Sequence, residues 1–161
     1  MKKLKIYLDT SVVSMLDQQD APERMAQTHQ LWDKIKGDKF DVVISDVVLR
    51  EINDCDSAKR RVLLRYLAEI KYQEIATDTA VMITVAEQFV DFGILKQKSI
   101  DDCRHIAAAI VSDCDVIVSW NFRHIVNHKT ITGVKTLARL NNYGDMLVYA
   151  PTVLVEGDQD D

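Results

Sequence analysis

Proline, glycine and cysteine are all scarce in this sequence of 161 residues. With two prolines and five glycines, few segments can form long loops, and we find neither an internal repeat nor a linker. The three cysteines are odd in number and include no C-x-x-C pair, which argues against a disulfide framework and against a cysteine-rich zinc site. They fit a reducing compartment instead.

Long apolar runs are also absent. No run approaches the roughly 20 residues that a membrane helix needs. The basic start of the chain is followed by an apolar run that is too short for a signal peptide, and Asp9 interrupts it. We therefore expect a cytoplasmic protein that makes no contact with a membrane.

The excess of acidic residues is concentrated at the C-terminus. The formal net charge is −5, but four acidic residues in the segment 156–161 contribute −4, so residues 1–155 carry only −1. Net charge thus neither supports nor excludes a nucleic-acid partner. Because 47% of the chain is apolar, we expect residues 1–155 to form a single domain and residues 156–161 to form an acidic mobile tail.

Short runs rich in β-branched residues alternate with amphipathic segments along the chain. The runs predict strands buried on both faces at 4–8, 42–44, 116–118 and 146–149, while 72–76 is either a further strand or a connection. Apolar residues at helical spacing predict helices at 22–36, 47–52, 58–70, 78–92, 100–112 and 130–141. This alternation predicts an α/β fold, a three-layer sandwich whose central, mainly parallel sheet of four to five strands is flanked by helices.

Oxygen-bearing side chains fall near the carboxyl ends of three predicted strands, where ligands bind in parallel sheets. Asp9 follows the first strand, Glu51 lies on the helix after the second, Asp102 begins the helix leading into the third, and Asn121 comes just after the third. Clustered carboxylates must take up protons or bind a cation. Mg²⁺ and Mn²⁺ prefer such oxygen ligands, and a bound metal activates water for phosphodiester hydrolysis.

Each of these residues also has an ordinary structural interpretation. Asp9 could cap the following helix, and Glu51 could be a solvated charge. Ser99 and Asp102 have the spacing of a capping box. The neighbouring Asp101 suits a first-turn charge, although the sequence does not exclude it as the ligand in place of Asp102. Asn121 could be a turn residue.

The histidines and the basic segment are less informative. His105 is interpreted as a packed or partly exposed helix residue, and His124 with His128 lacks a third ligand for zinc. Trp120 is interpreted as a core or rim residue. A basic segment is either a solvated helix face or a phosphate-binding surface; it comprises Lys59, Arg60, Arg61 and Arg65.

The order of four motifs resembles that of the PIN-domain family. Leu8-Asp9-Thr10-Ser11-Val12 is similar to the opening motif, and Ile44-Ser45-Asp46-Val47-Val48-Leu49-Arg50-Glu51-Ile52 is similar to the second. Asp102-Cys103-Arg104-His105-Ile106-Ala107-Ala108-Ala109 resembles the third, and Val118-Ser119-Trp120-Asn121-Phe122 occupies the place of the fourth. The resemblance covers residues 4–153. It departs at Asn121, where an aspartate is common in the family.

The resemblance implies a metal-dependent endoribonuclease. Asp9, Glu51 and Asp102 would hold Mg²⁺ or Mn²⁺, and the catalytic set would add Asn121, which would position a water. Residues that support these ligands or contact the substrate would be Thr10, Ser11 and Ser119. Many bacterial members are VapC-like toxins of type II toxin–antitoxin pairs, so RNA, a cognate antitoxin protein and a second copy of the chain are the expected partners.

Two other classes of function compete with this interpretation. Asn121 carries no charge, which favours a PIN-like module that binds RNA or a partner protein without cutting. A phosphotransfer enzyme or receiver domain also places an aspartate after a strand, but here the position two residues later is Ser11 and no second acid stands beside Asp9. The chain has neither a P-loop motif nor G-x-G-x-x-G, which argues against nucleotide-dependent roles.

Overall fold

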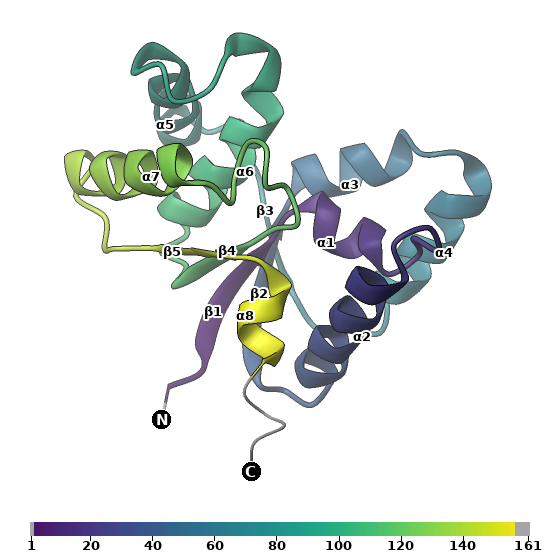
Figure 1. The fold of residues 1–161 in the computed structure, drawn as a ribbon. Coiled ribbons are helices and arrows are strands. Elements are labelled where there is room, and N and C mark those ends of the chain that lie inside the picture. Colours follow the sequence, from purple (N-terminus) through teal and green to yellow (C-terminus); the bar gives the residue numbers. More distant parts are fainter. Residues whose placement is uncertain (1, 157–161) are drawn as a thin grey trace.

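The computed structural model of the protein describes residues 2–156, so the predicted acidic tail lies, beyond Glu156, outside the described residues. Five strands alternate with helices along the chain (Figure 1). The strands are β1 (Leu4–Leu8), β2 (Phe40–Ser45), β3 (Gln73–Ile75), β4 (Val116–Val118) and β5 (Leu147–Tyr149). The helices are α1 (Thr10–Met15), α2 (Pro22–Lys36), α3 (Asp46–Asn53), α4 (Ser57–Leu67), α5 (Ala80–Asp91), the 3₁₀ turn η1 (Gln97–Ser99), α6 (Ile100–Val111), α7 (His128–Leu140) and α8 (Pro151–Val155).

The strands form one sheet in the order β3-β2-β1-β4-β5, and every pair is parallel. At its centre, Ile6 of β1 lies opposite Val42 on one side and Val116 on the other. The predicted α/β sandwich with a parallel sheet is therefore confirmed, and the segment 72–76 contributes a fifth strand. Within the described residues, no helix is long and apolar enough to span a bilayer.

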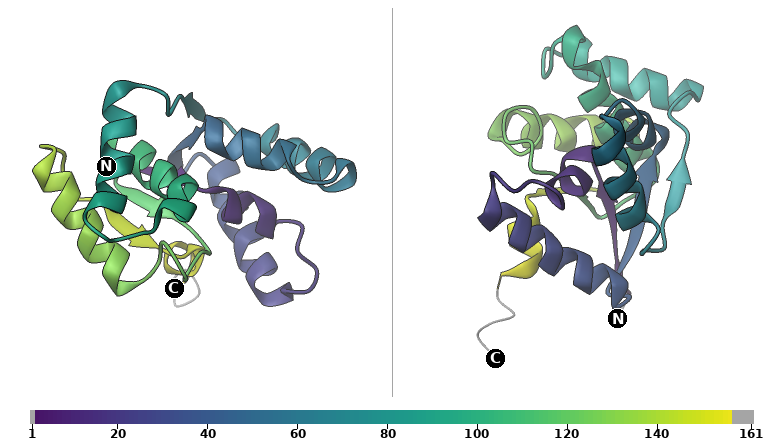
Figure 2. Two further views of the ribbon diagram at one scale, coloured as in Figure 1. Left: turned by 90° about the horizontal axis from the view of Figure 1, so that it is seen from above. Right: turned by 90° about the vertical axis from the view of Figure 1, so that its right-hand side faces the viewer.

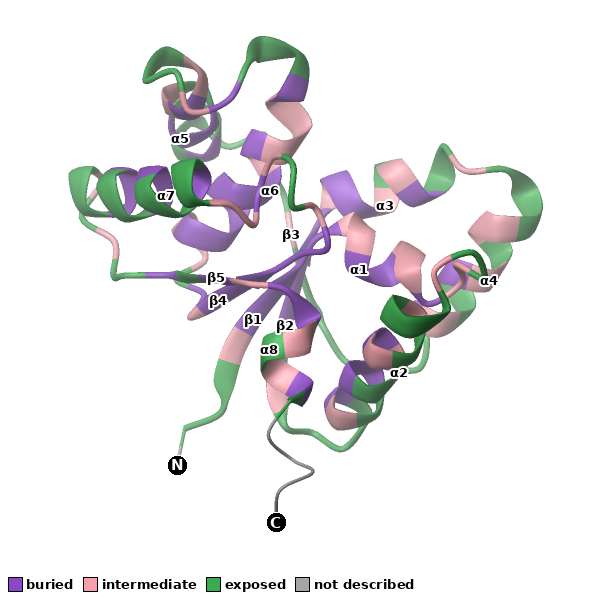
Figure 3. Cartoon of the chain, viewed as in Figure 1, coloured by how far each residue is buried: buried purple, intermediate pink, exposed green. Residues whose placement is uncertain are grey.

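Helices cover both faces of the sheet. Figures 1 and 2 show α5, α6 and α7 gathered on one side, with α1, α2, α3, α4 and α8 on the other. The central strands are buried between these two layers, as Figure 3 shows. Burial on both faces explains why these strands read as continuous apolar runs rather than as alternating ones.

Some predicted boundaries were wrong by a turn or less, and no range was predicted for the short elements α1, η1 and α8. The helix predicted at 58–70 ends at Leu67, and the helix predicted at 130–141 begins at His128. Asn127 sets that start, because its side chain accepts a hydrogen bond from the backbone N–H of Thr130. Helix α8 has only five residues, too few for a periodic signal.

A close contact between α7 and the α5–α6 connection yields a stability prediction. A Cβ atom added at the buried Gly133 would lie 2.5 Å from Cδ1 of Ile94. We expect Gly133→Val to lower the free energy of unfolding by about 1–3 kcal/mol, the usual cost of overpacking. Thr132→Val, at the adjacent exposed position, is the matched control. Urea denaturation checks the prediction, and Ile94→Ala should restore part of the loss if the clash is its cause.

Candidate active site at the carboxyl ends of the strands

Asp9 lies directly after β1, and its carboxylate is held by two serine hydroxyls. Its side chain is almost fully buried, with 3% of the residue exposed. The Ser11 hydroxyl donates to Oδ1 at 2.6 Å, and the Ser119 hydroxyl donates to Oδ2 at 2.5 Å. Burial raises the pKa of Asp9, and the charge of His105 together with the serine hydrogen bonds opposes that rise. The site therefore contains an aspartate whose charge is only partly compensated by protein groups.

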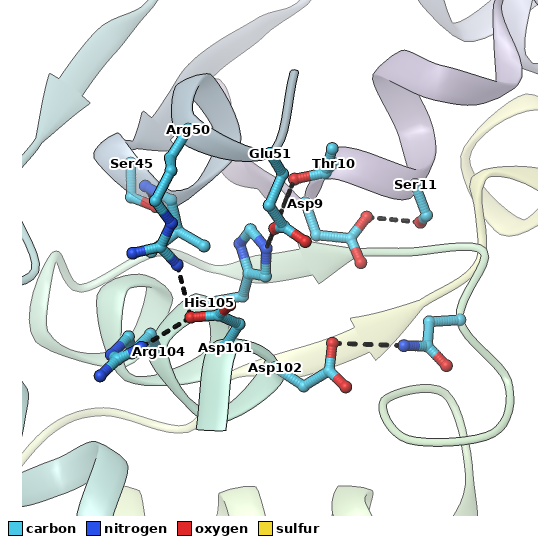
Figure 4. Close-up of polar contacts among 12 residues, drawn as sticks. Asp9, Thr10, Ser11, Ser45, Arg50, Glu51, Asp101, Asp102, Arg104 and His105 are labelled. Atoms are coloured by element: carbon cyan, nitrogen blue, oxygen red, sulfur yellow. Dashed lines mark hydrogen bonds and ion pairs between the residues drawn. The ribbon is translucent and has the colours of Figure 1, made fainter. Parts of the chain in front are cut away.

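Glu51 lies on α3 and points towards the same end of the sheet. Its Oε1 accepts hydrogen bonds from the Thr10 hydroxyl at 2.9 Å and from Nε2–H of His105 at 2.6 Å (Figure 4). Burial alone would raise the pKa of Glu51, but the hydrogen bond and charge of His105, with the bond from Thr10, bring the pKa below its ordinary value. Glu51 is thus ionised, and within residues 2–156 no donor contacts its Oε2.

His105 is the buried centre of this cluster, with only 2% of the residue exposed. Its Nδ1 lies 2.7 Å from the Tyr7 hydroxyl, which lies 2.7 Å from the Ser45 hydroxyl. Burial alone would lower the pKa of His105, but its hydrogen bond to Glu51 and the charges of Asp9, Glu51 and Asp102 raise it. The three predicted metal ligands therefore all lie close enough to act on one histidine.

A second histidine–carboxylate pair lies at Asp102, in the first turn of α6. His124 Nδ1 is 2.8 Å from Oδ2 of Asp102, and Asn121 Nδ2 donates to Oδ1 at 3.4 Å. The oxygen of Asn121 accepts the backbone N–H of His124 at 2.9 Å. Asn121 therefore both forms the turn and contacts Asp102, and the part of the amide that faces the acid is its nitrogen.

Asp101 points away from the site, although it is adjacent to Asp102. Its Oδ1 accepts from Arg50 Nη2 at 2.5 Å and from Arg104 Nη1 at 2.7 Å (Figure 4). Burial opposes ionisation of Asp101, but these two arginines lower its pKa below the ordinary value. The structure assigns Asp101 to a bridge between α3 and α6.

The capping interpretations of Asp9 and Ser99 are wrong. Asp9 occupies the position before α1, but its side chain accepts no hydrogen bond from that helix's backbone. Ser99 likewise makes no side-chain cap at α6, so the capping-box spacing of Ser99 and Asp102 is coincidental. The Asp9 carboxylate instead accepts from the hydroxyls of Ser11, in α1, and of Ser119, whereas Asp102 contacts Asn121 and His124.

Comparison with known proteins identifies the architecture. No family model matches the chain, and no curated protein matches it in sequence. Among solved structures, the chain is similar to VapBC2 from Rickettsia felis, which was crystallised with a DNA fragment from the VapBC2 promoter. The superposition has a TM-score of 0.56 and covers 91% of this chain and 98% of the other, and the two sequences are 10% identical. The fold is PIN-like. In this fold Asp9 directly follows β1, Glu51 lies on α3 after β2, Asp102 lies at the start of α6, and Asn121 follows β4.

The donor chemistry of the site suits a hard cation, although no metal cage is preformed. Among residues 2–156, no three histidine, cysteine or acidic side chains gather closely enough to hold an ion together. Figure 4 shows Glu51 hydrogen-bonded to His105 and Asp9 to Ser11, with Asp102 in the same part of the molecule. Mg²⁺ usually keeps several waters and needs only one or two direct carboxylates. The oxygen donors therefore fit a water-rich ion.

The contacts of two histidines with the candidate carboxylates were not predicted from the sequence. His105 was interpreted as a packed helix residue, and it is buried, but it also holds Glu51. The signal available was its position three residues after Asp102, on the face of α6 that turns towards the sheet. The partner of His124 is Asp102, which its spacing from His128 does not indicate.

The His105–Glu51 pair predicts a pH dependence of stability. The pKa of His105 is raised above 6.5, so its contribution to stability is complete below pH 6.5 and is lost as pH rises through the folded-state pKa. Because the pKa of Glu51 is lowered from 4.5, its contribution to the free energy of unfolding is complete above pH 4.5 and is lost only at more acidic pH. We expect the free energy of unfolding to fall from pH 6.5 to pH 8.5, and to fall less in His105→Gln. Urea titrations at three pH values measure this, and equal slopes for both proteins would contradict it.

Proposed function

We propose that this protein is a metal-dependent endoribonuclease that hydrolyses phosphodiester bonds of RNA with Mg²⁺ or Mn²⁺. The observation that carries the proposal is the convergence of Asp9, Glu51 and Asp102, which come from distant parts of the chain, around one buried histidine in a PIN-like fold. A nuclease needs a group that activates water and neutralises charge at the phosphate, and a bound divalent cation supplies both.

The side chains of the site have separate parts in this proposal. Asp9, Glu51 and Asp102 would hold the ion, while Ser11 and Ser119 orient the Asp9 carboxylate through their hydroxyls. Thr10 and His105 orient Glu51 from one side and leave its second oxygen open to the site. Asn121 orients Asp102. Preorganised carboxylates of this kind lose little entropy when an ion or substrate binds.

The proposal extends to the partners of the protein. The compared structure is VapBC2 with promoter DNA, and we propose that this chain likewise acts as the toxin of a type II toxin–antitoxin pair, in the cytoplasm, as a homodimer, and restrained by a cognate antitoxin. Co-expression with the product of the adjacent reading frame tests the pairing. The proposal predicts relief of growth inhibition and a stable complex on size exclusion.

A second function is favoured by one observation. Each of the three carboxylates already binds neighbouring side chains: Asp9 binds serines, Glu51 binds His105, and Asp102 binds His124. A PIN-like module that binds RNA or a partner protein without cutting would have this arrangement permanently. Calorimetric titration with Mn²⁺ separates the two functions. If the protein is a nuclease, it should bind Mn²⁺, and Glu51→Gln should weaken that binding. If it is a binding module, it should bind no Mn²⁺, or its Mn²⁺ affinity should not change in Glu51→Gln.

The direct test of the proposed function is incubation of the purified protein with single-stranded RNA. We expect cleavage in Mg²⁺ or Mn²⁺ and none in EDTA, with activity restored when the metal is returned. Cleavage that continues unchanged in EDTA would contradict metal dependence. Failure to cleave any of a panel of RNAs in either metal would contradict the nuclease and favour the binding module.

A further inference from the structure

A groove beside the candidate site is lined by cations. It lies between the α5–α6 connection and the start of α7, encloses about 610 Å³, and is bordered by segments 93–99 and 123–130. In Figure 1, α5 and α7, whose ends border the groove, lie together with α6 on one side of the sheet. Among its lining residues are four exposed cationic side chains: Lys96, Lys98, Arg123 and Lys129.

The charge of this groove is uncompensated. No aspartate or glutamate is among its lining residues. Within residues 2–156, none of the four cations lies within ion-pair distance of a carboxylate, whereas Arg50, Arg104 and Arg139 do form such pairs. In a chain of net charge −5, four unpaired cations around one hollow form a local field that attracts a polyanion.

The groove is continuous with the candidate active site. His124 lines the groove, and the same side chain donates to Asp102 at 2.8 Å. Ser99, also in the lining, directly precedes α6, whose first turn carries Asp102. A chain molecule with a phosphodiester bond at the carboxylates could therefore run from the site past His124 into the groove.

In the basic segment of α4, Lys59 and Arg60 have a structural role. Lys59 Nζ donates to the backbone carbonyl of Asp17 at 3.3 Å and to Oε1 of Gln18 at 2.9 Å. Arg60 donates to the carbonyl of Asn53 at 3.2 Å. These contacts tie Lys59 and Arg60 to neighbouring loops. Arg61 and Arg65 of α4 remain exposed cations, but only the groove cations share a lining with His124, which contacts Asp102.

We propose that this groove binds the sugar–phosphate backbone of single-stranded RNA on one side of the scissile bond. The inference rests on the proposed function, because it takes RNA as the molecule that the site acts on. Flexible lysines and an arginine suit phosphate contacts that are independent of base sequence. The groove therefore contributes affinity and positions the strand, while the carboxylates act at the bond that is cut.

Fluorescence anisotropy with labelled 15-nucleotide oligouridine RNA, in EDTA and without cleavage, tests the groove. The variant Lys98→Gln/Arg123→Gln/Lys129→Gln is compared with Arg61→Gln/Arg65→Gln/Lys71→Gln, which removes the same charge from exposed positions elsewhere. We expect Kd to rise about tenfold or more for the groove variant and less than about threefold for the control. The slope of log Kd against log salt should fall by about 2, since each neutralised phosphate contact on a single strand contributes about 0.7.

Several results would contradict the proposal that this groove binds RNA. Equal Kd for wild type and the groove variant would do so, as would an equal loss in the control, provided that thermal melting shows all three proteins folded. A labelled 15-residue polyglutamate that binds as tightly as the RNA, with the same dependence on the three cations, would replace RNA by an acidic peptide as the ligand. Because binding is measured without metal, the two proposals can fail separately. If the wild-type protein binds RNA through the groove but cuts no RNA in Mg²⁺ or Mn²⁺, the nuclease proposal is contradicted and the groove proposal is supported.

Discussion

Asp9→Asn is expected to lower metal-dependent RNA cleavage roughly a hundredfold or more, because in the proposed nuclease it removes a buried negative charge from the ion that would activate water. The substitution keeps the shape of the side chain. Ser11 and Ser119 can reorient their hydroxyls to satisfy an amide, so the surrounding geometry should survive. Single-turnover cleavage of end-labelled RNA measures the effect.

The stability of Asp9→Asn distinguishes loss of function from loss of fold. Burial raises the pKa of Asp9, so the ionised carboxylate costs folding free energy at neutral pH. We expect the free energy of unfolding of Asp9→Asn to equal or exceed that of wild type while activity is lost. Asp33→Asn, on the exposed surface of α2, is the control that should change neither. Cleavage by Asp9→Asn at the wild-type rate would contradict the assignment.

The adjacent pair Asp101 and Asp102 provides the second large contrast. Asp102→Asn should lower cleavage about 30-fold or more, because Asp102 lies in the site with His124 and Asn121. Asp101→Asn should leave cleavage within about threefold of wild type. It loses partly exposed ion pairs to Arg50 and Arg104, which are worth at most about 1 kcal/mol each.

Cleavage rates and urea denaturation of the two variants, measured side by side, test this contrast. The pair is well matched, since both residues lie in the first turn of α6 and differ in the direction of the side chain. If Asp101→Asn were the inactive variant and Asp102→Asn the active one, the metal ligand would be Asp101, the alternative that the sequence alone left open.

The sheet was predictable because its determinants are local. Buried parallel strands are short β-branched runs, and the alternation of such runs with helical segments predicts a parallel sheet. The position of Asp9 after β1 and of Asn121 after β4 follows from the same pattern. The edge strand β3 was ambiguous, since its three residues include Gln73 and Glu74, which are exposed.

The internal order of the site was not predictable in the same way. The hydrogen bond between His105 and Glu51 joins residues 54 positions apart, and Ser119 reaches Asp9 across 110 positions. Such pairs depend on strand register and on the rotation of α6 against the sheet, which no local pattern encodes. For the same reason, the sequence could not show that Asp101 turns to the arginines while Asp102 turns to the site.

The contacts of His105 and His124 bear on how the carboxylates could bind a metal ion. An ion that enters between Asp9, Glu51 and Asp102 must share these carboxylates with His105 and His124. Sharing is possible because a carboxylate oxygen has two lone pairs and because Glu51 Oε2 has no donor within the described residues. The histidines would then fix the carboxylates in place rather than compete with the ion, as outer partners of metal ligands commonly do.

The most direct test of the central claim is an anomalous difference map from crystals of the protein soaked in Mn²⁺. The account predicts a peak about 2.2 Å from a carboxylate oxygen of Asp9, Glu51 or Asp102, with the remaining acids reached directly or through water. The peak should disappear in crystals of Asp9→Asn prepared in the same way. A wild-type map without a peak among these three acids, in crystals whose Mn²⁺ uptake is shown at other surface positions, would contradict the account.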